Sequence, residues 1–257
     1  MSAELTQDTS EDAVLGGRLL LRQPRRGHRV GHDAILLAAA TGARRDEHAV
    51  DLGAGVGAAG LALATRVPDM NVTLVEIDPA LTELAAGNAR LNAMEMRVRA
   101  VTCDAEDIAA LGRAGLGGAS IDRVLMNPPF NDATRQNVSP DARRRLAHAA
   151  GPGLLSRWVA SAAWLLKPQG VLTLIWRADA LGDVLAALKP EFGAVAVLPV
   201  LPRAGAPAIR VLVRAVKAGS GAMRDYPGLA LNDGQGKPSA AAEAVLRAGE
   251  TLAMADY

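Results

Sequence analysis

Short apolar runs alternate with longer Ala- and Leu-rich stretches from residue 49 onward. Five runs have the length and continuous hydrophobicity of buried strands, and they cover residues 49–53, 72–78, 98–104, 122–127 and 171–176. Strands that alternate with helices predict a parallel sheet covered by helices on both faces. The pattern therefore predicts a doubly wound α/β fold.

Two more strands are predicted after the fifth, at residues 194–200 and 208–216. They lie close enough along the chain to pair antiparallel at one edge of the sheet. Helical periodicity is clearest at residues 33–40, 181–188 and 240–247. We expect a mostly parallel seven-stranded sheet with a closing antiparallel hairpin.

The chain of 257 residues is long enough for one large domain with its own core. Residues 1–13 are polar and acidic without periodicity, so we expect a disordered tail. The remainder, 14–257, is predicted to be a single domain. It comprises a basic amino-terminal segment and helix (14–45), the sheet core (46–217) and a carboxy-terminal extension (218–257).

Composition narrows the classes of function. Half of the residues are hydrophobic, but no uninterrupted apolar run reaches the roughly 18 residues of a membrane span. The polar, acidic first dozen residues do not resemble a signal peptide, so we expect a cytoplasmic protein without a membrane partner. The single cysteine, Cys103, has no companion for a disulfide or a metal site. We expect a buried Cys103, no metal, and a monomer or weak dimer.

A glycine-rich turn follows the first predicted strand, and two interpretations fit it. Gly55, Gly57 and Gly60 satisfy the G-x-G-x-x-G dinucleotide pattern, with Glu76 where a ribose-binding acid belongs. Alternatively, Asp51-x-Gly53-x-Gly55 is the loop of an S-adenosylmethionine site, whose ligand has a ribose but no pyrophosphate. The loop alone does not decide between them.

Polar residues end each of the first four predicted strands. Asp51, Glu76 and Asp104 fall at the carboxyl ends of the first three, and Asn127 at the end of the fourth. Open parallel sheets bind ligands at this edge. An adenosylmethionine site needs an anion near the amino group, a carboxylate for the ribose hydroxyls and a polar group at the adenine edge. The series favours the second interpretation, whereas Asp78 before Pro79 is predicted to be an ordinary helix N-cap.

Asn127 is followed at once by Pro128, Pro129 and Phe130, which end the fourth strand abruptly. An exocyclic amine on a nucleobase is a poor nucleophile because its lone pair is delocalised into the ring. If the Asn127 side-chain oxygen and the Pro128 carbonyl accept the amine hydrogens, the lone pair can point at a methyl donor. Phe130 can stack on the base.

In order and spacing, the glycine turn, the acid series and the Asn-Pro-Pro-Phe motif resemble those of class I methyltransferases that modify planar nitrogens. The chain is most similar to bacterial tRNA(adenine-N6)-methyltransferases acting on valine tRNA, because Gly31, Asp33, Leu36 and Leu37 match a motif at a helix start in that family. His32 replaces the usual threonine, Ala40 stands at a common aromatic position, and Ala149 replaces an acid.

The resemblance implies a methyl transfer from S-adenosylmethionine to the N6 of an adenine beside the anticodon of a valine tRNA. It implies catalysis by Asn127, Pro128, Pro129 and Phe130. The implied cofactor residues are His32, Asp51, Gly53, Gly55, Glu76, Asp104, Ala105 and Asn127.

Two arginine clusters are the candidate grip on tRNA, although the net charge is only +1. They are predicted to hold phosphates on either side of an extruded base. Solvated faces of an arginine-rich protein are the other interpretation. The clusters comprise Arg22, Arg25, Arg26 and Arg29 before the first helix, and Arg143, Arg144 and Arg145 after the proline motif.

Three alternative functions stay open at this point. A methyltransferase acting on a glutamine amide of a translation factor would share the Asn-Pro-Pro-Phe motif, but it has no need of the arginine clusters. A non-catalytic RNA-binding module on the same fold has no physical need to keep all of Asp51, Glu76, Asp104 and Asn127. A nicotinamide dehydrogenase leaves the proline motif unexplained.

Overall fold

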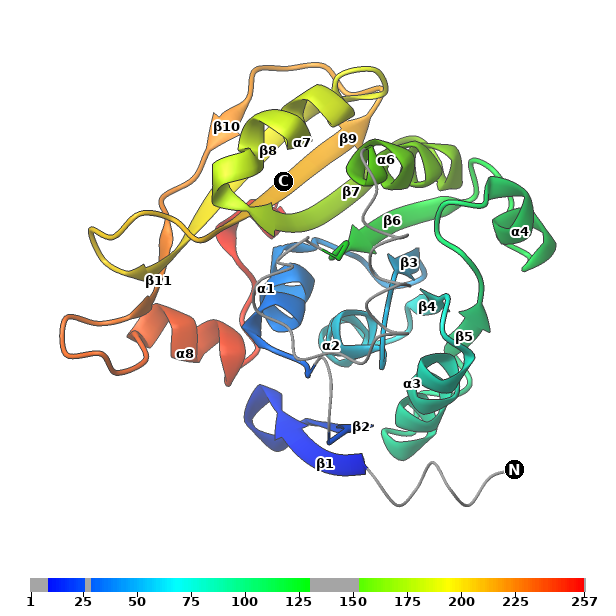
Figure 1. Ribbon diagram of the computed structural model, residues 1–257, viewed down its shortest axis with the longest axis horizontal. Helices are drawn as coiled ribbons and strands as arrows, with labels where there is room; N and C mark the ends of the chain where they lie inside the picture. Colours follow the sequence, from blue (N-terminus) through cyan, green and yellow to red (C-terminus); the bar gives the residue numbers. More distant parts are fainter. Residues whose placement is uncertain (1–8, 26–28, 130–152, 257) are drawn as a thin grey trace.

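A nine-stranded sheet forms the centre of the computed structural model, which describes residues 9–25, 29–129 and 153–256 (Figure 1). The strand order is β10-β8-β9-β7-β6-β3-β4-β5, and β11 also pairs with β8. The bounds are β3 (His48–Leu52), β4 (Asn71–Glu76), β5 (Val98–Thr102), β6 (Ile121–Met126), β7 (Leu166–Arg177), β8 (Phe192–Arg203), β9 (Arg210–Lys217), β10 (Arg224–Asp225) and β11 (Leu229–Asn232).

Strands β3 to β7 pair in parallel, and β9 is antiparallel to both β7 and β8. The predicted doubly wound α/β fold with a closing antiparallel hairpin is confirmed. The expected number of seven strands is too low, because β10 and β11 extend the sheet along β8. These two strands come from the carboxy-terminal extension. They are too short to produce a hydrophobic run from which a strand could be predicted.

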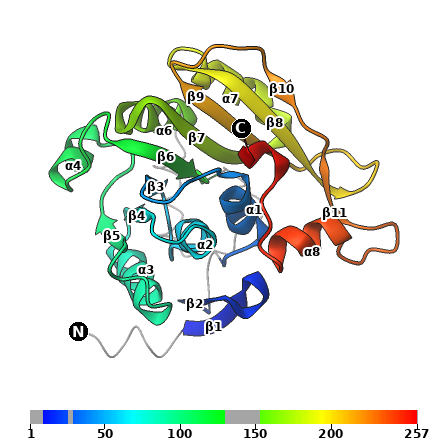
Figure 2. The same ribbon diagram turned by 180° about the vertical axis from the view of Figure 1, so that it is seen from behind.

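Helices cover both faces of the sheet (Figures 1 and 2). One apolar cluster holds the buried residues of α1 (His32–Ala40), α2 (Ala58–Arg66) and α3 (Pro79–Leu91), and the other those of α4 (Ile108–Arg113), α6 (Leu154–Leu165) and α7 (Leu181–Leu188). In β3, Ala49 belongs to the first cluster, whereas Val50 and Leu52 belong to the second. A strand buried on both faces accounts for the continuous apolar runs in the sequence.

An amino-terminal hairpin lies beside this core. Strand β1 (Thr9–Val14) pairs antiparallel with β2 (Leu19–Pro24), and a 3-10 turn at Leu15–Gly17 connects them. The expectation of disorder for residues 1–13 is therefore wrong for residues 9–13. The acidic side chains of these residues suggest a solvated segment. In the structure, two of the acids pair with arginines, as described below, and the residues form a strand.

The end of the chain packs back on the first helix. Helix α8 (Ala240–Leu246) contacts α1 and β11, and a last 3-10 turn covers Ala253–Asp256. The amide of Leu252 donates to the carbonyl of Ala39 at 2.9 Å, and Met254 is fully buried. The extension thus contributes to the core around α1. Another 3-10 turn, Ala178–Ala180, lies between β7 and α7.

Candidate functional site

The register of the sheet brings three strand ends to one edge. Leu52 of β3 lies level with Val75 of β4 on one side and with Met126 of β6 on the other. The chain leaves β3 outward through β4 and β5 and then returns to β6, so the strand order reverses at β3. Such a reversal is where doubly wound sheets bind ligands. Gly53, Glu76 and Asn127 follow directly and meet there.

The glycine turn after β3 is built tightly on the neighbouring strand. The amides of Gly53 and Ala54 both donate to the carbonyl of Val75 at 2.9 Å. Gly53, Gly55 and Gly57 have φ angles of +70°, +57° and +88°, a region that favours glycine. A Cβ at Gly55 would have no atom within 4 Å. The turn therefore presents open space at Gly55, where a ligand can approach the backbone.

Asp51 anchors the helix that follows this turn. Its side chain is 2 % exposed, and its Oδ2 accepts a hydrogen bond from the amide of Gly60 at 2.8 Å. Burial raises the pKa of Asp51 to about 7, the hydrogen bond from Gly60 opposes that rise, and the charge of Glu76 adds to it. One oxygen is thus committed to the fold, and contact of Asp51 with a cofactor stays a prediction.

Glu76 joins the glycine turn to the segment that follows β4. Its Oε2 accepts from the amide of Gly55 at 2.8 Å, and its Oε1 accepts from the amide of Asp78 at 2.9 Å. Each carboxylate oxygen can accept a second hydrogen bond, so Glu76 keeps capacity for two hydroxyls. The next residue, Ile77, is 62 % exposed. An exposed apolar side chain beside that carboxylate suits the flat face of a base.

Asn127 carries an unsatisfied acceptor at the end of β6. Its Oδ1 is buried and has no hydrogen-bond partner among the described residues, although a buried acceptor without a donor costs about 1 to 3 kcal/mol. Pro128 behind it is buried, and Pro129 is half-buried. The site therefore fits a ligand that brings an N–H or O–H donor to Asn127. Phe130, predicted to stack on the base, lies outside the described residues.

The remaining predicted cofactor residues flank this edge. Asp104 is exposed just beyond β5, and its Oδ1 accepts from the amide of Glu106 at 2.9 Å. Ala105 is buried, as is the nearby Cys103, which was predicted to be a small buried residue. His32 is exposed at the first residue of α1. Their part in cofactor binding stays a prediction.

A tryptophan from α6 closes one side of the glycine turn, and sequence reasoning missed it. A Cβ on Gly53 would lie 2.4 Å from Cη2 of Trp158, so only glycine fits against the indole. Glu106 holds this ring: its Oε1 accepts from Trp158 Nε1 at 3.3 Å, and its Oε2 accepts from Arg157 Nε at 2.5 Å. No local motif announces Trp158, whereas Ile77 could have been found as the apolar residue after the strand-ending acid.

Three arginines of the first predicted RNA-binding cluster are exposed, but two of them are already paired. Arg22 Nε lies 3.1 Å from Glu11 Oε2, and Arg29 Nη2 lies 2.8 Å from Asp12 Oδ2. Arg25 is exposed just beyond β2. The hairpin is therefore less positive than its arginines suggest. Arg26, Arg143, Arg144 and Arg145 lie outside the described residues.

Comparison with known protein families identifies the family to which this chain belongs. The model of the methyltransferase small domain matches residues 29–200, which is more than half of the chain. The chain belongs to the methyltransferase small domain family. The match includes the glycine turn, Glu76 and Asn127, so the assembled strand ends lie inside the family's own domain.

Two curated relatives of this methyltransferase domain are named for different substrates, one for the N6 of an adenine and the other for a glutamine. The tRNA1(Val) (adenine(37)-N6)-methyltransferase of Porphyromonas gingivalis is 33% identical over 160 residues, 61% of this chain and 61% of the relative. The release factor glutamine methyltransferase of Chlorobaculum tepidum is 30% identical over 155 residues, 58% of this chain and 52% of the relative. The alignments thus span less than two thirds of these relatives' lengths.

A solved structure extends the likeness over most of the fold. A predicted O-methyltransferase, protein Atu636 from Agrobacterium tumefaciens, is 28% identical, with a TM-score of 0.72. The match covers 86% of this chain and 98% of the other. The likeness therefore extends beyond the 172 residues, 29–200, that the family model matches.

Two kinds of feature are absent from the described ranges. Within them, no helix combines the length and the apolar character needed to cross a bilayer. The same ranges contain no cluster of three or more His, Cys, Asp or Glu side chains placed to hold a metal ion.

Proposed function

We propose that this protein transfers a methyl group from S-adenosylmethionine to the exocyclic N6 of an adenine in tRNA, next to the anticodon of a valine tRNA. The observation that carries the proposal is the buried, unpartnered Oδ1 of Asn127, followed by two prolines at the strand-reversal point. An exocyclic amine supplies the donor that this oxygen lacks. The relatives named for adenine N6 support the choice of adenine.

The cofactor, when bound, supplies the methyl group. Glu76 would accept the ribose hydroxyls with the capacity left on its two oxygens, while it holds the Gly55 amide. Ile77, exposed beside it, would cover a face of the adenine ring. Asp104, exposed at the end of β5, would accept from the adenine edge. Open space at Gly55 allows close approach to the backbone.

The residues after β6 would orient the substrate amine. Asn127 Oδ1 and the Pro128 carbonyl would accept its two hydrogens, which draws the nitrogen towards tetrahedral geometry and frees its lone pair. Proline has no N–H, so no donor competes with the carbonyl at this position. The proton can leave after the methyl arrives, so a strong general base is not required.

A glutamine amide in a translation factor is the second candidate. It offers the same planar nitrogen with two hydrogens, and a relative named for release factor glutamine supports it. Arg22, Arg25 and Arg29 are exposed, although Arg22 and Arg29 are paired with acids. These cations favour the nucleic acid, because a protein loop needs no cluster of cations.

Transfer of labelled methyl groups separates the two candidates. The purified protein is incubated with labelled S-adenosylmethionine and, in parallel, with total tRNA, a release factor or duplex DNA. We expect label in tRNA and N6-methyladenosine in its nucleoside digest. Label on a glutamine of the release factor, with tRNA untouched, would show that the second candidate is correct.

A further inference from the structure

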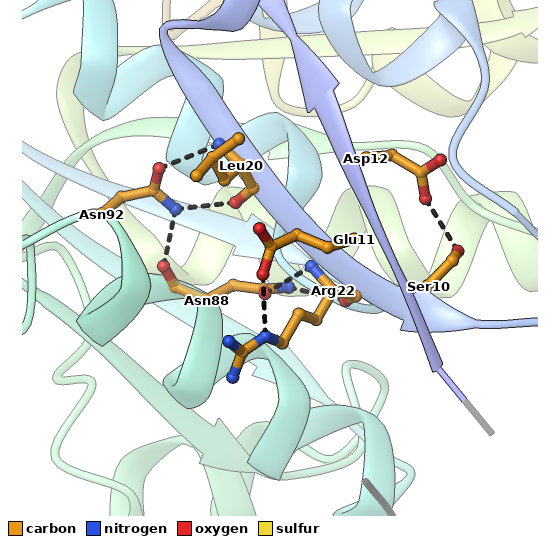
Figure 3. Close-up of polar contacts among 7 residues, drawn as sticks. All are labelled: Ser10, Glu11, Asp12, Leu20, Arg22, Asn88 and Asn92. Carbon is orange, nitrogen blue, oxygen red and sulfur yellow. Dashed lines mark hydrogen bonds and ion pairs between the residues drawn. The ribbon is translucent and has the colours of Figure 1, made fainter. Parts of the chain in front are cut away.

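Helix α3 receives the amino-terminal hairpin in the way a neighbouring strand would (Figure 3). Asn92 accepts from the amide of Leu20 at 2.9 Å and donates to the carbonyl of Leu20 at 2.8 Å. Asn88 accepts from the amide of Arg22 at 2.8 Å and donates to its carbonyl at 3.0 Å. Each asparagine side chain thus forms hydrogen bonds with both the amide and the carbonyl of one residue of β2.

The spacing of the two asparagines explains this fit. Residues two apart in a strand point to the same side and are separated by about 6.8 Å. Residues four apart in a helix share a face and rise by about 6 Å. Asn88 and Asn92 therefore match the outward groups of Leu20 and Arg22, so α3 satisfies an edge strand that would otherwise lack partners.

Asn88 makes one contact that Asn92 does not. Its Nδ2 also donates to the carbonyl of Val56 at 2.9 Å, and the residue is fully buried. Val56 lies in the glycine turn, between Gly55 and Gly57. Both amide hydrogens of Asn88 are thus used, one on the hairpin and one on the turn.

We propose that Asn88 is a positioning residue that makes the amino-terminal hairpin a structural part of the methyl-donor site. Gly55 and Gly57, on either side of Val56, have positive φ angles, and the buried donor to the Val56 carbonyl helps to fix the path between them. Because one amide joins both segments, movement of the hairpin is coupled to the shape of the turn. This inference rests on the proposed function of the turn as the methyl-donor site.

The hairpin has other contacts that keep it folded when either asparagine is changed. Leu19 and Leu21 of β2 are fully buried in the apolar cluster that contains α2 and α3. Substitution of one asparagine therefore perturbs the edge of β2 without removing its packing. Asn92 is a matched control, because it binds the same strand in the same way, whereas its other hydrogen bond goes to the main-chain carbonyl of Asn88 and not to the turn.

The first measurement needs no ligand. In the full chain, Asn88→Ala is expected to speed amide hydrogen exchange by at least tenfold in both β2 and residues 54–57. Asn92→Ala is expected to speed exchange in β2 while residues 54–57 stay within about twofold of wild type. Equal exchange in the turn of both variants would overturn the coupling. If Asn88→Ala does not fold, Asn88→Asp, which keeps the acceptor and removes both donors, takes its place.

The second measurement is calorimetric titration with S-adenosylmethionine. Asn88→Ala is expected to bind at least tenfold more weakly than wild type, and Asn92→Ala within about threefold of it. Wild-type affinity in Asn88→Ala would overturn the positioning role alone. Absence of binding by the wild-type protein would overturn the proposed function together with this role, which keeps the two failures distinguishable.

Discussion

The carboxylate of Asp51 accepts a hydrogen bond from the amide of Gly60 at a distance of 2.8 Å, and both residues are buried. The contact ties the end of β3 to the first turns of α2, with the glycine turn closed between them. A Cβ on Gly60 would lie 2.4 Å from Cδ2 of Leu74 and 3.2 Å from Oδ2 of Asp51. The turn is thus held by the hydrogen bond from Gly60 to the buried Asp51, and this close approach requires a glycine at position 60.

Asp51 should make stability depend on pH. Burial raises its pKa to about 7, so the folded protein keeps a proton that the unfolded chain loses above about pH 4. The free energy of unfolding from this group therefore falls as pH rises from about 4 to about 7, by up to about 1.4 kcal/mol per unit. Asp51→Asn removes this dependence. Urea unfolding of both proteins across that window measures it, and a constant difference between them would contradict it.

Gly60→Ala should destabilise the fold by about 1 to 3 kcal/mol, because the added methyl group meets the side chain of Leu74. Gly87→Ala in α3 is the matched control, since its Cβ meets only Arg90 Nη2, at 3.9 Å. That change should stabilise by about 0.5 to 1 kcal/mol through helix propensity. Thermal unfolding of both variants checks the opposite signs, and equal effects would show that packing at Gly60 is not limiting.

Glu76→Ala should weaken binding of S-adenosylmethionine by about 1.5 to 3 kcal/mol, because charge-assisted bonds to the ribose are lost. The change also frees the amides of Gly55 and Asp78, which loosens the turn. Calorimetry measures the affinity, with Glu83→Ala on the exposed surface of α3 as a control for loss of one negative charge. Unchanged affinity in Glu76→Ala would remove this residue from the site.

Asn127→Ala should lower the rate of methyl transfer by at least about 100-fold, equivalent to about 3 kcal/mol of transition-state stabilisation. Affinity for S-adenosylmethionine should change far less, because Asn127 acts on the amine. Single-turnover assays with tRNA and a parallel titration separate the two effects. Wild-type turnover in the variant would refute the mechanism.

Local signals in the sequence were sufficient for the strand ends. Asp78 before Pro79 predicts an N-cap, and Asp78 Oδ1 does accept from the amide of Ala80 at 2.9 Å. The acids at the carboxyl ends of β3 and β4 were found in the same way, because a parallel sheet must bring its carboxyl ends together. Such features depend on neighbours in the chain or on the topology alone.

Features that depend on tertiary contacts could not be predicted. Trp158 meets Gly53 only because α6 packs on β6 and β7, and neither residue marks the other in the sequence. Strand β1 could not be predicted for a related reason. Its acidic residues are typical of a solvated tail, and only the tertiary structure pairs them with Arg22 and Arg29. The charge pattern was visible, but the pairing that decides its meaning was not.

Glu11→Gln should strengthen binding of tRNA and make it more sensitive to salt. Both partners of the pair with Arg22 are at least 44% exposed, so the pair adds little to stability, and its loss leaves Arg22 free for a phosphate. One added phosphate contact steepens the slope of log affinity against log salt by about 0.7 to 0.9. Asp69→Asn adds the same charge by freeing Arg45. Asp69 precedes β4 and Arg45 precedes β3, so this pair lies at the opposite ends of these strands from the site. Filter-binding titrations at several salt concentrations should show the steeper slope only in Glu11→Gln. Equal slopes in both variants would mean that the hairpin arginines act through net charge and do not contact the RNA.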